Sequence, residues 1–351
     1  MIDIAILGAG VMGSAMAVPA GALKRRVALV GTHLDDAIIG AVQSDGRHPR
    51  LGVVLPESVS AHAWTEFGAV MAQRPRLLIL GVASAGVEWA IERIAESAQA
   101  PLPVLMITKG LLAVGDGIEV LPHVVRREVK RRRGFDIPVM AVGGPCIAGE
   151  LAATRDTSVV VSGGGPGDID NVFELLGADF YHARRSEDLT GVEVCAAFKN
   201  FYALAVGWAN GNRERRGPGS NGALMHNVAA GLFTQAITEM EILVAALGGQ
   251  RATVAGLAGA GDLYVTCLAG RNSRMGRLLG LGEAYSEAKA KHMPNDTVEG
   301  AELAKALGPT LRRMVASGRL PGERLPLLTA IVDAVLDDRP LTIDWRRCWR
   351  A

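Results

Sequence analysis

The sequence predicts an α/β domain with a doubly wound, mostly parallel sheet, followed by an all-α domain. Over the first half of the chain, short β-like runs recur between helical stretches, which is typical of a parallel sheet with helices on both faces. The second half holds long apolar stretches at helical spacing and no convincing strand. A chain of 351 residues is also long for one core. We therefore expect two domains, at residues 1–187 and 188–351.

Each expected element follows from its own local pattern. Runs of aliphatic and β-branched residues between turn signals predict the strands of the first domain. Apolar residues at helical spacing predict the helices of the second domain, and the Gly-rich, charged segment 210–222 predicts a mobile connection between two of them. The expected strands are residues 2–7, 27–30, 77–82, 104–108, 139–142 and 158–162, and the expected helices are 191–208, 227–247 and 297–307.

Composition excludes several classes of protein. Lys and Arg number 37 against 36 Asp and Glu, a net charge of +1, so the basic footprint of a nucleic-acid binder is missing. A basic run at 126–133 has no interleaved aromatic residues and is expected to be a solvated helix end. The four cysteines are scattered singly, which fits a reducing cytosol and no metal site. No leader and no apolar run of about 18 residues is seen, so we expect a cytoplasmic protein without membrane insertion.

A glycine-rich loop follows the first expected strand. Gly8 permits a tight turn, Gly10 lets a pyrophosphate approach the backbone, and Gly13 lets the next helix pack closely on the strand. An ordinary Gly-rich turn is the alternative. The strand before the loop, the helix-compatible residues after it and the further strand at 27–30 favour a dinucleotide site, in which Val11 and Met12 complete the loop.

The choice between NAD and NADP stays open in the sequence. An acid is expected at the end of the second strand when the ribose hydroxyls of NAD are bound in the usual way. That strand ends instead in Gly31, Thr32 and His33, and Asp35 and Asp36 come slightly late. NAD or NADP is therefore the expected coenzyme.

Lys199 stands in the middle of a segment, 191–206, that is apolar nearly all round its helical projection. A buried ammonium without partners is costly, so such a lysine either reaches the surface along its own stem or is held in a functional cleft. A lysine in a cleft can donate a proton to a developing alkoxide. After a nicotinamide-binding domain, a proton donor for carbonyl reduction is the favoured interpretation.

Further polar residues occur at short Gly-containing turns. Lys109 follows the strand at 104–108, at the sheet edge where open α/β sheets bind ligands. Asp262 ends a Gly-Ala-Gly turn, and Arg271 with Asn272 can present donors to an anion. Their alternatives are a surface lysine, a helix cap and a surface salt bridge. Together with Lys199, they favour a substrate site.

The chain as a whole resembles the NAD(P)-dependent glycerol-3-phosphate dehydrogenases from the glycine loop to about residue 340. The resemblance depends on several motifs in the family's order, and the combination is far more specific than any one of them. Beyond the glycine loop, the matching stretches are 108–110, Gly144 and Pro145 with Ala148 and Glu150, 191–193, 198–200, 256–267, Arg271 and Asn272 with Gly276, and Glu299 with Gly300.

The resemblance implies a Rossmann domain, a helical domain, a homodimer and hydride transfer between NAD or NADP and a small phosphorylated substrate, dihydroxyacetone phosphate or sn-glycerol 3-phosphate. Lys199 is then the acid/base residue, with Lys109 and Asp262 also catalytic. The implied substrate contacts are Lys109, Gly144, Cys146, Asn200, Arg271 and Asn272, and the implied cofactor contacts are Gly8, Gly10, Val11, Met12, Gly13, Ala148, Arg271, Thr297 and Glu299.

Three positions depart from the family pattern. Cys146 stands where Ser or Thr is usual, Gln235 where Arg is usual, and Asp296 where Gln is frequent. Alternatives therefore stay open: a dehydrogenase of the same fold acting on another phosphorylated ketose, polyol or 2-oxo acid, or a nicotinamide-binding sensor without turnover. Trp345 and Trp349 are expected to cover a surface or to pack against a partner.

Overall fold

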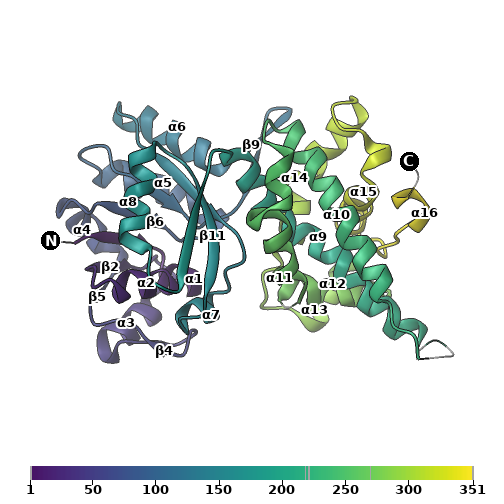
Figure 1. Cartoon of the computed structure of the whole chain (residues 1–351), viewed down its shortest axis with the longest axis horizontal. Coiled ribbons are helices and arrows are strands. Elements are labelled where there is room, and N and C mark those ends of the chain that lie inside the picture. The colour runs from purple at the N-terminus through teal and green to yellow at the C-terminus, as the bar shows by residue number, and fades with distance from the viewer. Residues whose placement is uncertain (1, 218, 220–221, 269, 350–351) are drawn as a thin grey trace. The chain divides into compact units, whose positions relative to one another are not determined.

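The computed structural model describes residues 2–217, 219, 222–268 and 270–349 and contains two compact units (Figure 1). The first unit is Met1–Lys109 with Leu121–Leu189, and the second is Gly110–Val120 with Thr190–Ala351. The expected domains differ from these units in two respects: Asp188 and Leu189 belong to the first unit, and Gly110–Val120 belongs to the second. The segment Gly110–Val120 forms a hairpin that packs on the second unit, where the Arg319 guanidinium donates to the carbonyl of Asp116.

An eight-stranded sheet forms the centre of the first unit, in the order β12-β11-β10-β7-β6-β1-β2-β5. Neighbouring strands run parallel except β10 and β11, which are antiparallel. The expected doubly wound, mostly parallel sheet is thus confirmed. The strands are β1 (Ile4–Leu7), β2 (Val27–Val30), β5 (Val59–His62), β6 (Leu77–Leu80), β7 (Val104–Met106), β10 (Val139–Gly143), β11 (Thr157–Gly163) and β12 (Tyr181–Ser186).

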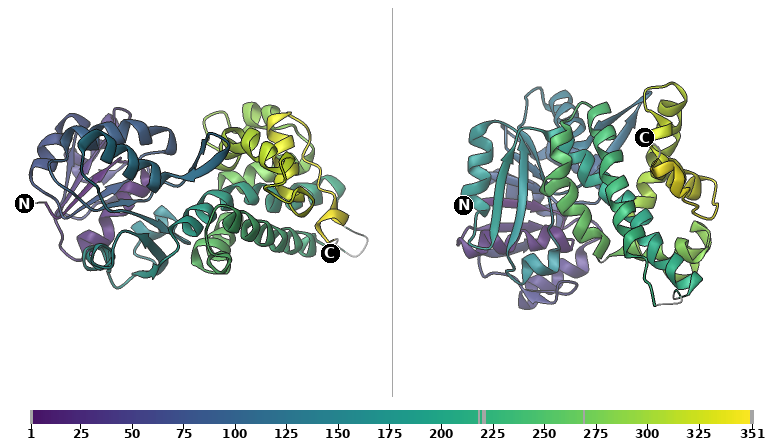
Figure 2. Two further views of the ribbon diagram at one scale, coloured as in Figure 1. Left: turned by 90° about the horizontal axis from the view of Figure 1, so that it is seen from above. Right: turned by 45° about the vertical axis from the view of Figure 1, so that its right-hand side comes forward.

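Helices cover both faces of this sheet (Figure 2). In β1, Ile4 and Ile6 point into one apolar cluster and Ala5 and Leu7 into the other, so all four side chains are buried. This is why the central strands are continuous apolar runs. On one face lie α1 (Val11–Ala15), α2 (Ala17–Ala22), α3 (Asp36–Asp45), α7 (Ala148–Ala152) and α8 (Pro166–Leu176), and on the other α4 (Phe67–Ala72), α5 (Val87–Ser97) and α6 (Leu121–Arg133).

The edge strands β5 and β12 and two short antiparallel ladders are present in addition to the expected strands. β12 contains exposed arginines and a histidine, and β5 is only half-buried. An edge strand of this kind lacks the apolar run by which a central strand is recognised. The two short antiparallel ladders are β3 (Arg47–His48) with β4 (Val53–Val54) and β8 (Leu111–Val114) with β9 (Gly117–Val120).

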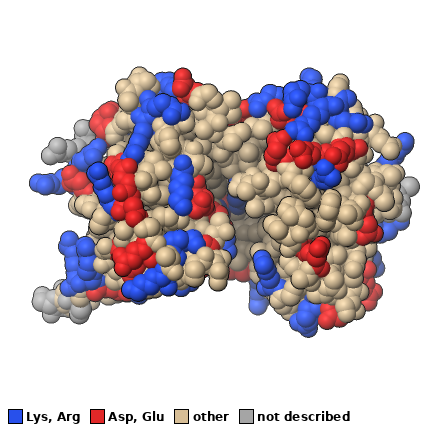
Figure 3. Space-filling view, turned by 180° about the vertical axis from the view of Figure 1, so that it is seen from behind, with Lys and Arg blue, Asp and Glu red and all other residues tan. Residues whose placement is uncertain are grey.

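The basic run at 126–133 forms the last turns of α6. Its basic side chains are exposed or partly exposed, and two of them pair with acids: Arg126 with Asp136, and Arg132 with Glu88 of α5. At the upper right of Figure 3, the blue atoms on the face of this unit lie against red ones. The run is a solvated helix end, as expected.

The second unit is helical apart from the β8–β9 hairpin in its described residues. The expectation of a loop from residue 210 is wrong, because α9 continues to Arg216; positions 218, 220 and 221 of that segment lie outside the described residues. The α-helices are α9 (Leu189–Arg216), α10 (His226–Ala246), α11 (Asp262–Leu268), α12 (Arg271–Leu281), α13 (Tyr285–His292), α14 (Glu299–Ala316), α15 (Pro326–Leu336) and α16 (Trp345–Cys348).

Two helices, α9 and α10, are long and apolar enough to cross a membrane, which the sequence analysis did not anticipate. The most apolar window of α9 is 83% buried inside the protein and that of α10 is 44% buried. The composition of α9 therefore follows from its place in the core of the second unit, since a helix that is apolar all round is a buried helix.

Glycines let three helices of the second unit approach one another at backbone distance. A Cβ on Gly276 of α12 would overlap the carbonyl of Leu204 in α9, and a Cβ on Gly280 would overlap that of Trp208. Gly300 of α14 lies in the same way against the carbonyl of Asn200. These contacts account for part of the 43 glycines of the chain. They also bring the first turns of α12 and α14 close to the middle of α9.

Candidate functional site

The glycine loop has the backbone geometry of a nucleotide-binding turn. Gly8 has φ +110°, and a Cβ there would lie 2.7 Å from the carbonyl carbon of Gly81. A Cβ on Gly13 would overlap the carbonyl of Gly8. No heavy atom lies within 4 Å of the Cβ position of Gly10, which leaves the backbone there open to a pyrophosphate at the start of α1.

Side chains beyond the motif also hold this loop. The amide of Ala9 donates to Asp35 Oδ2 over 3.2 Å, and His48 Nε2 lies 3.0 Å from the carbonyl oxygen of Ala9. Asp35 is therefore a contact of the loop itself, and His48 is a residue of this site that is not among the predicted ones. Because the β3–β4 ladder that carries His48 was not predicted, no local signal marked this residue.

A small pocket of the first unit brings four predicted residues together. It is lined by Met12 of the glycine loop, Lys109, Gly144 and Cys146, with other residues that include Tyr181. Burial, together with Cys146 nearby, raises the pKa of Tyr181 well above its usual value, so its hydroxyl stays protonated. The pocket lies where β7 and β10 end, at the sheet edge expected to bind ligands.

Thr108 fixes the chain just before Lys109. Its hydroxyl donates to the carbonyls of Leu80 and Val82, at 3.2 and 2.7 Å. Both acceptors belong to the end of β6 and the turn after it, so the ends of two neighbouring strands are joined at this point. The backbone that presents Lys109 is thereby held in place.

Lys199 forms a buried ion pair with Asp262. The lysine is only 9% exposed and the aspartate 1%, so the alternative of a lysine reaching the surface is wrong. Asp262 opens α11 directly after a π-helical turn, Leu257–Gly261, and such turns are frequent at functional sites. Gly259 permits this turn because a Cβ there would overlap the carbonyl of Val254.

A second polar cluster joins the first turns of α12 and α14 to α9. Arg271 donates from Nε to the carbonyl of Thr297 over 2.8 Å and forms an ion pair with Glu299. Asn272 donates to Asn200 Oδ1 over 3.0 Å and to Glu299 over 3.3 Å. Its own Oδ1 accepts from the amide of Gly300. Apart from the Lys199–Asp262 pair, the predicted site residues of this unit therefore lie in one network, which consists of Asn200, Arg271, Asn272, Thr297 and Glu299.

Gln235, one of the departures from the family pattern, belongs to a different cluster. Its amide nitrogen donates to Glu239 Oε1 over 3.0 Å, and both residues are buried. Glu239 also accepts from Tyr202 and from the amides of Leu327 and Leu328 in the first turn of α15. Gln235 therefore supports a junction of three helices, α9, α10 and α15, and supplies no cation.

Glu239 is expected to make stability depend on pH. Burial raises its pKa to about 7, against the lowering effect of its four hydrogen bonds. The folded chain therefore holds a proton that the unfolded chain releases above about pH 4.5. The resulting stabilisation is fully present below about pH 4.5 and is lost as the pH rises through about 7, about 3 kcal/mol in all.

The measurement is the free energy of unfolding by urea between pH 5 and 8, for the wild type and for Glu239→Gln. The neutral variant keeps the shape of the side chain, so its stability should change less between pH 5 and 8, by about 2 kcal/mol, because part of the full change lies below pH 5. If the free energy of unfolding changed with pH in the same way in both proteins, this carboxyl would be ionised in the folded state.

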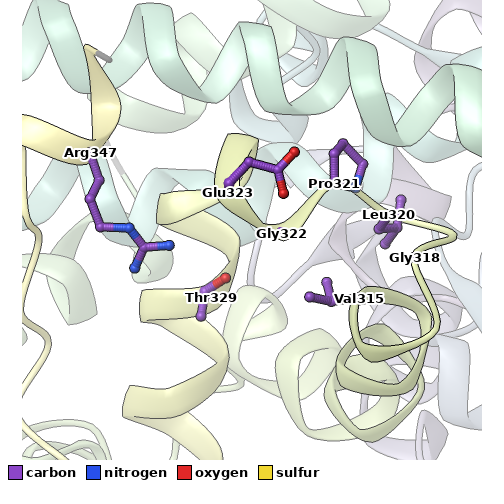
Figure 4. A pocket seen from close by; sticks show the side chains of 8 residues that line it. All are labelled: Val315, Gly318, Leu320, Pro321, Gly322, Glu323, Thr329 and Arg347. Carbon is purple, nitrogen blue, oxygen red and sulfur yellow. The ribbon is translucent and has the colours of Figure 1, made fainter. Parts of the chain in front are cut away.

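A surface hollow of the second unit lies at the C-terminal end of α14 (Figure 4). Glu323 and Arg347 project over it beside apolar and small residues such as Val315 and Thr329. None of the predicted site residues lines it. Among the described residues, no group of three His, Cys, Asp or Glu side chains could hold a metal ion.

The predicted residues thus form sets within each unit. The first unit holds the glycine loop and the pocket with Lys109, and Ala148 begins α7 of the same unit. The second unit holds the Lys199–Asp262 pair and the network around Asn272.

Comparison with known proteins points to one family over both units. Residues 3–165 match the N-terminal profile described as NAD-dependent glycerol-3-phosphate dehydrogenase, and residues 188–342 match the corresponding C-terminal profile. The NADP(+)-dependent glycerol-3-phosphate dehydrogenase of Archaeoglobus fulgidus is 33% identical over 288 residues, 81% of this chain and 82% of that protein. A glycerol-3-phosphate dehydrogenase of Symbiobacterium thermophilum, named for NAD(P)+, is 32% identical over 344 residues, 97% and 91% of the two chains.

A solved structure agrees with these matches. The crystal structure of glycerol-3-phosphate dehydrogenase from Coxiella burnetii superposes with a TM-score of 0.79 and 26% identity, and the match covers 98% of this chain and 97% of that one. Fold, sequence and order of motifs therefore agree over nearly the full length. The chain belongs to the NAD(P)-dependent glycerol-3-phosphate dehydrogenase family of oxidoreductases.

Proposed function

We propose that this protein reduces dihydroxyacetone phosphate to sn-glycerol 3-phosphate with NADH or NADPH, reversibly. The observation that carries the proposal is the buried Lys199–Asp262 pair in a chain that also has a complete glycine loop. A buried lysine held by a carboxylate costs stability. It is suited to catalysis because it keeps a cation ready at a fixed place.

Lys199 and Asp262 have different roles in the proposed reaction. The glycine loop would hold the coenzyme, which would supply a hydride to the carbonyl carbon, C2, of the substrate. Lys199 stabilises the oxyanion that forms on the carbonyl oxygen and gives it a proton from Nζ, which yields the alcohol and a neutral amine. Asp262 holds the ammonium in place before this step, and solvent returns the proton afterwards. In the oxidative direction the neutral amine takes the hydroxyl proton.

The substrate phosphate is assigned to the network of the second unit. The first turn of α12 offers backbone amides and the positive end of a helix dipole, and Arg271 adds a guanidinium that Glu299 and Thr297 hold in position. Asn272 and Asn200 are largely engaged with each other and with Gly300. We therefore propose that these two asparagines position Arg271 and the first turns of α12 and α14. Lys109 is proposed as a second cation acting on the substrate.

Cys146 supports a second candidate function. It lines the pocket with Lys109 and Gly144 in place of the family's usual hydroxyl residue, and a thiol is a weaker hydrogen-bond donor than a hydroxyl. A related phosphorylated ketose, polyol or 2-oxo acid is therefore the alternative substrate. We further propose a cytoplasmic homodimer, in keeping with the thiol form of the four cysteines.

The assay that tests the proposal follows nicotinamide absorbance in mixtures of the protein with dihydroxyacetone phosphate and either NADH or NADPH. Turnover with at least one coenzyme is expected, and sn-glycerol 3-phosphate with the oxidised coenzyme should run the reaction backwards. A panel of phosphorylated ketoses and 2-oxo acids is assayed in parallel. Faster turnover of another substrate would reassign the enzyme within its fold, and coenzyme binding without any turnover would favour a sensor.

Arg271→Gln should raise KM for dihydroxyacetone phosphate by about 100-fold, because a charged hydrogen bond to phosphate is lost. Arg274→Gln is the matched control: Arg274 lies on the same helix, is similarly exposed and pairs with Asp296. Initial rates over a range of substrate concentrations give KM and kcat for each variant. Equal changes of KM in the two variants would remove Arg271 from the phosphate site.

A further inference from the structure

Two side chains from outside the glycine motif hold the peptide groups on either side of Ala9. This residue is fully buried between Gly8 and Gly10. Its amide donates to Asp35 Oδ2 over 3.2 Å, and its carbonyl oxygen lies 3.0 Å from His48 Nε2. A carboxylate and an imidazole thus fix the backbone at the centre of the loop.

Asp35 connects this loop to the turn after β2. The same oxygen, Oδ2, accepts from the amide and from the hydroxyl of Thr32, both at 2.8 Å. Three donors converge on one carboxylate oxygen, which is a strong arrangement because the acceptor is charged. The ends of β1 and β2 are therefore joined through Asp35, the first acid that follows β2 in the chain.

The neighbours of His48 determine its tautomer. Its ring is completely buried, and Nδ1 accepts from the amides of Arg50 and Leu51 at 3.2 and 3.1 Å. Because Nδ1 is an acceptor, Nε2 carries the hydrogen and donates it to the carbonyl of Ala9. The hydroxyl of Ser14 donates to the same carbonyl over 3.2 Å. The imidazole thus links the β3–β4 hairpin to the glycine loop.

We propose that Asp35 and His48 are positioning residues for the coenzyme, and that Asp35 holds the glycine loop instead of binding the ribose. The inference rests on the proposed function, since it concerns the same coenzyme. An acid that binds the ribose hydroxyls favours NAD and opposes the 2′-phosphate of NADP. An acid that holds the loop affects only the pyrophosphate site, which the two coenzymes share. The two roles therefore predict different changes in coenzyme selectivity.

The Asp35 variants separate these roles by the ratio of the dissociation constants for NADH and NADPH, measured by calorimetry. Asp35→Ala removes three hydrogen bonds and should weaken both coenzymes by the same factor, about tenfold. Asp35→Asn keeps one oxygen for these donors and should restore most of the affinity, again with an unchanged ratio. Asp36→Ala is the control for charge alone, because Asp36 begins α3 next to Asp35. A selective loss of NADH affinity in either Asp35 variant would identify a ribose ligand and overturn the proposal.

The His48 variants separate its two contacts. Asn at this position keeps an acceptor near Nδ1 and loses the donor to Ala9, whereas Gln keeps a donor near Nε2 and loses the acceptor. His48→Asn should weaken both coenzymes by about tenfold and His48→Gln should restore binding. Equal affinities in the two variants would overturn the role of the Ala9 contact. Circular dichroism of each variant shows whether it is folded. If Asp35→Ala does not fold, the ratio of the NADH and NADPH dissociation constants of the conservative variant Asp35→Asn still tests the proposal.

Binding also distinguishes this inference from the proposed function. Calorimetry needs no turnover, so the inference can fail while the reduction of dihydroxyacetone phosphate is observed. Conversely, the predicted ratios can be found in a protein that shows no turnover.

Discussion

Replacing Lys199 by methionine should lower kcat by about 1,000-fold, within the range that general acid catalysis contributes, and leave the dissociation constant for NADH nearly unchanged. Methionine is unbranched and apolar, and it has nearly the length of the lysine stem, so the helix position is preserved while the proton donor and the cation are lost. Steady-state rates of reduction give kcat, and calorimetry gives the coenzyme affinity. Lys305→Met, which removes an exposed lysine paired with Glu302, is the matched control and should retain wild-type rates.

The buried carboxylate requires a second variant. With Lys199 gone, Asp262 stays 1% exposed without its counter-ion, and breaking such a pair costs about 3–5 kcal/mol of stability. The double variant Lys199→Met with Asp262→Asn leaves no unpaired charge in this place. It should be more stable than the single variant and equally inactive. A kcat near that of the wild type in either folded variant would remove Lys199 from catalysis.

Gly276→Ala should destabilise the protein by about 3 kcal/mol or more, because its new Cβ would meet backbone that no rotamer change can move. The atom it would overlap is the carbonyl oxygen of Leu204 in α9. α12 has to move away from α9, and the first turn of α12 carries Arg271 and Asn272. We therefore also expect a higher KM for the phosphorylated substrate in whatever fraction remains folded. Urea unfolding and substrate saturation curves measure the two effects.

Gly40→Ala is the matched substitution. Gly40 lies in α3, and no heavy atom lies within 4 Å of its Cβ position, so alanine should stabilise the helix by up to about 1 kcal/mol. Similar unfolding curves for Gly276→Ala and Gly40→Ala would mean that α9 and α12 are not in backbone contact.

The central strands and the long helices were predictable because their signals are local. Every side chain of β1 is buried, so the strand is an apolar run directly in front of a Gly-rich turn. β12 was not predictable, since a strand at the edge of the sheet keeps exposed arginines. The charged end of α9 resembles a loop in the sequence, because the last turns of this helix extend beyond its apolar pattern.

The sequence indicates which residue types are candidates for the site, but it gives little information on their contacts. A lysine in an apolar helix is an anomaly that a sequence reveals by itself, and Lys199 is buried as that anomaly suggested. Its partner, 63 positions along the chain, could only be suggested by a resemblance. In the sequence, Gln235 stands where the family usually has an arginine, and in the structure it lies in a buried junction with Glu239.

The fold class, the glycine loop and the resemblance to the family can all be read from the sequence alone. Each of these depends on a short pattern or on several patterns in a fixed order. Only the tertiary structure decided what Lys199 pairs with, which helices meet at Gly276, and that Asp35 and His48 hold Ala9 from two separate elements. Hydrogen bonds and ion pairs between distant segments depend on how the elements pack. Periodicity along the chain reports local structure and therefore does not predict those contacts.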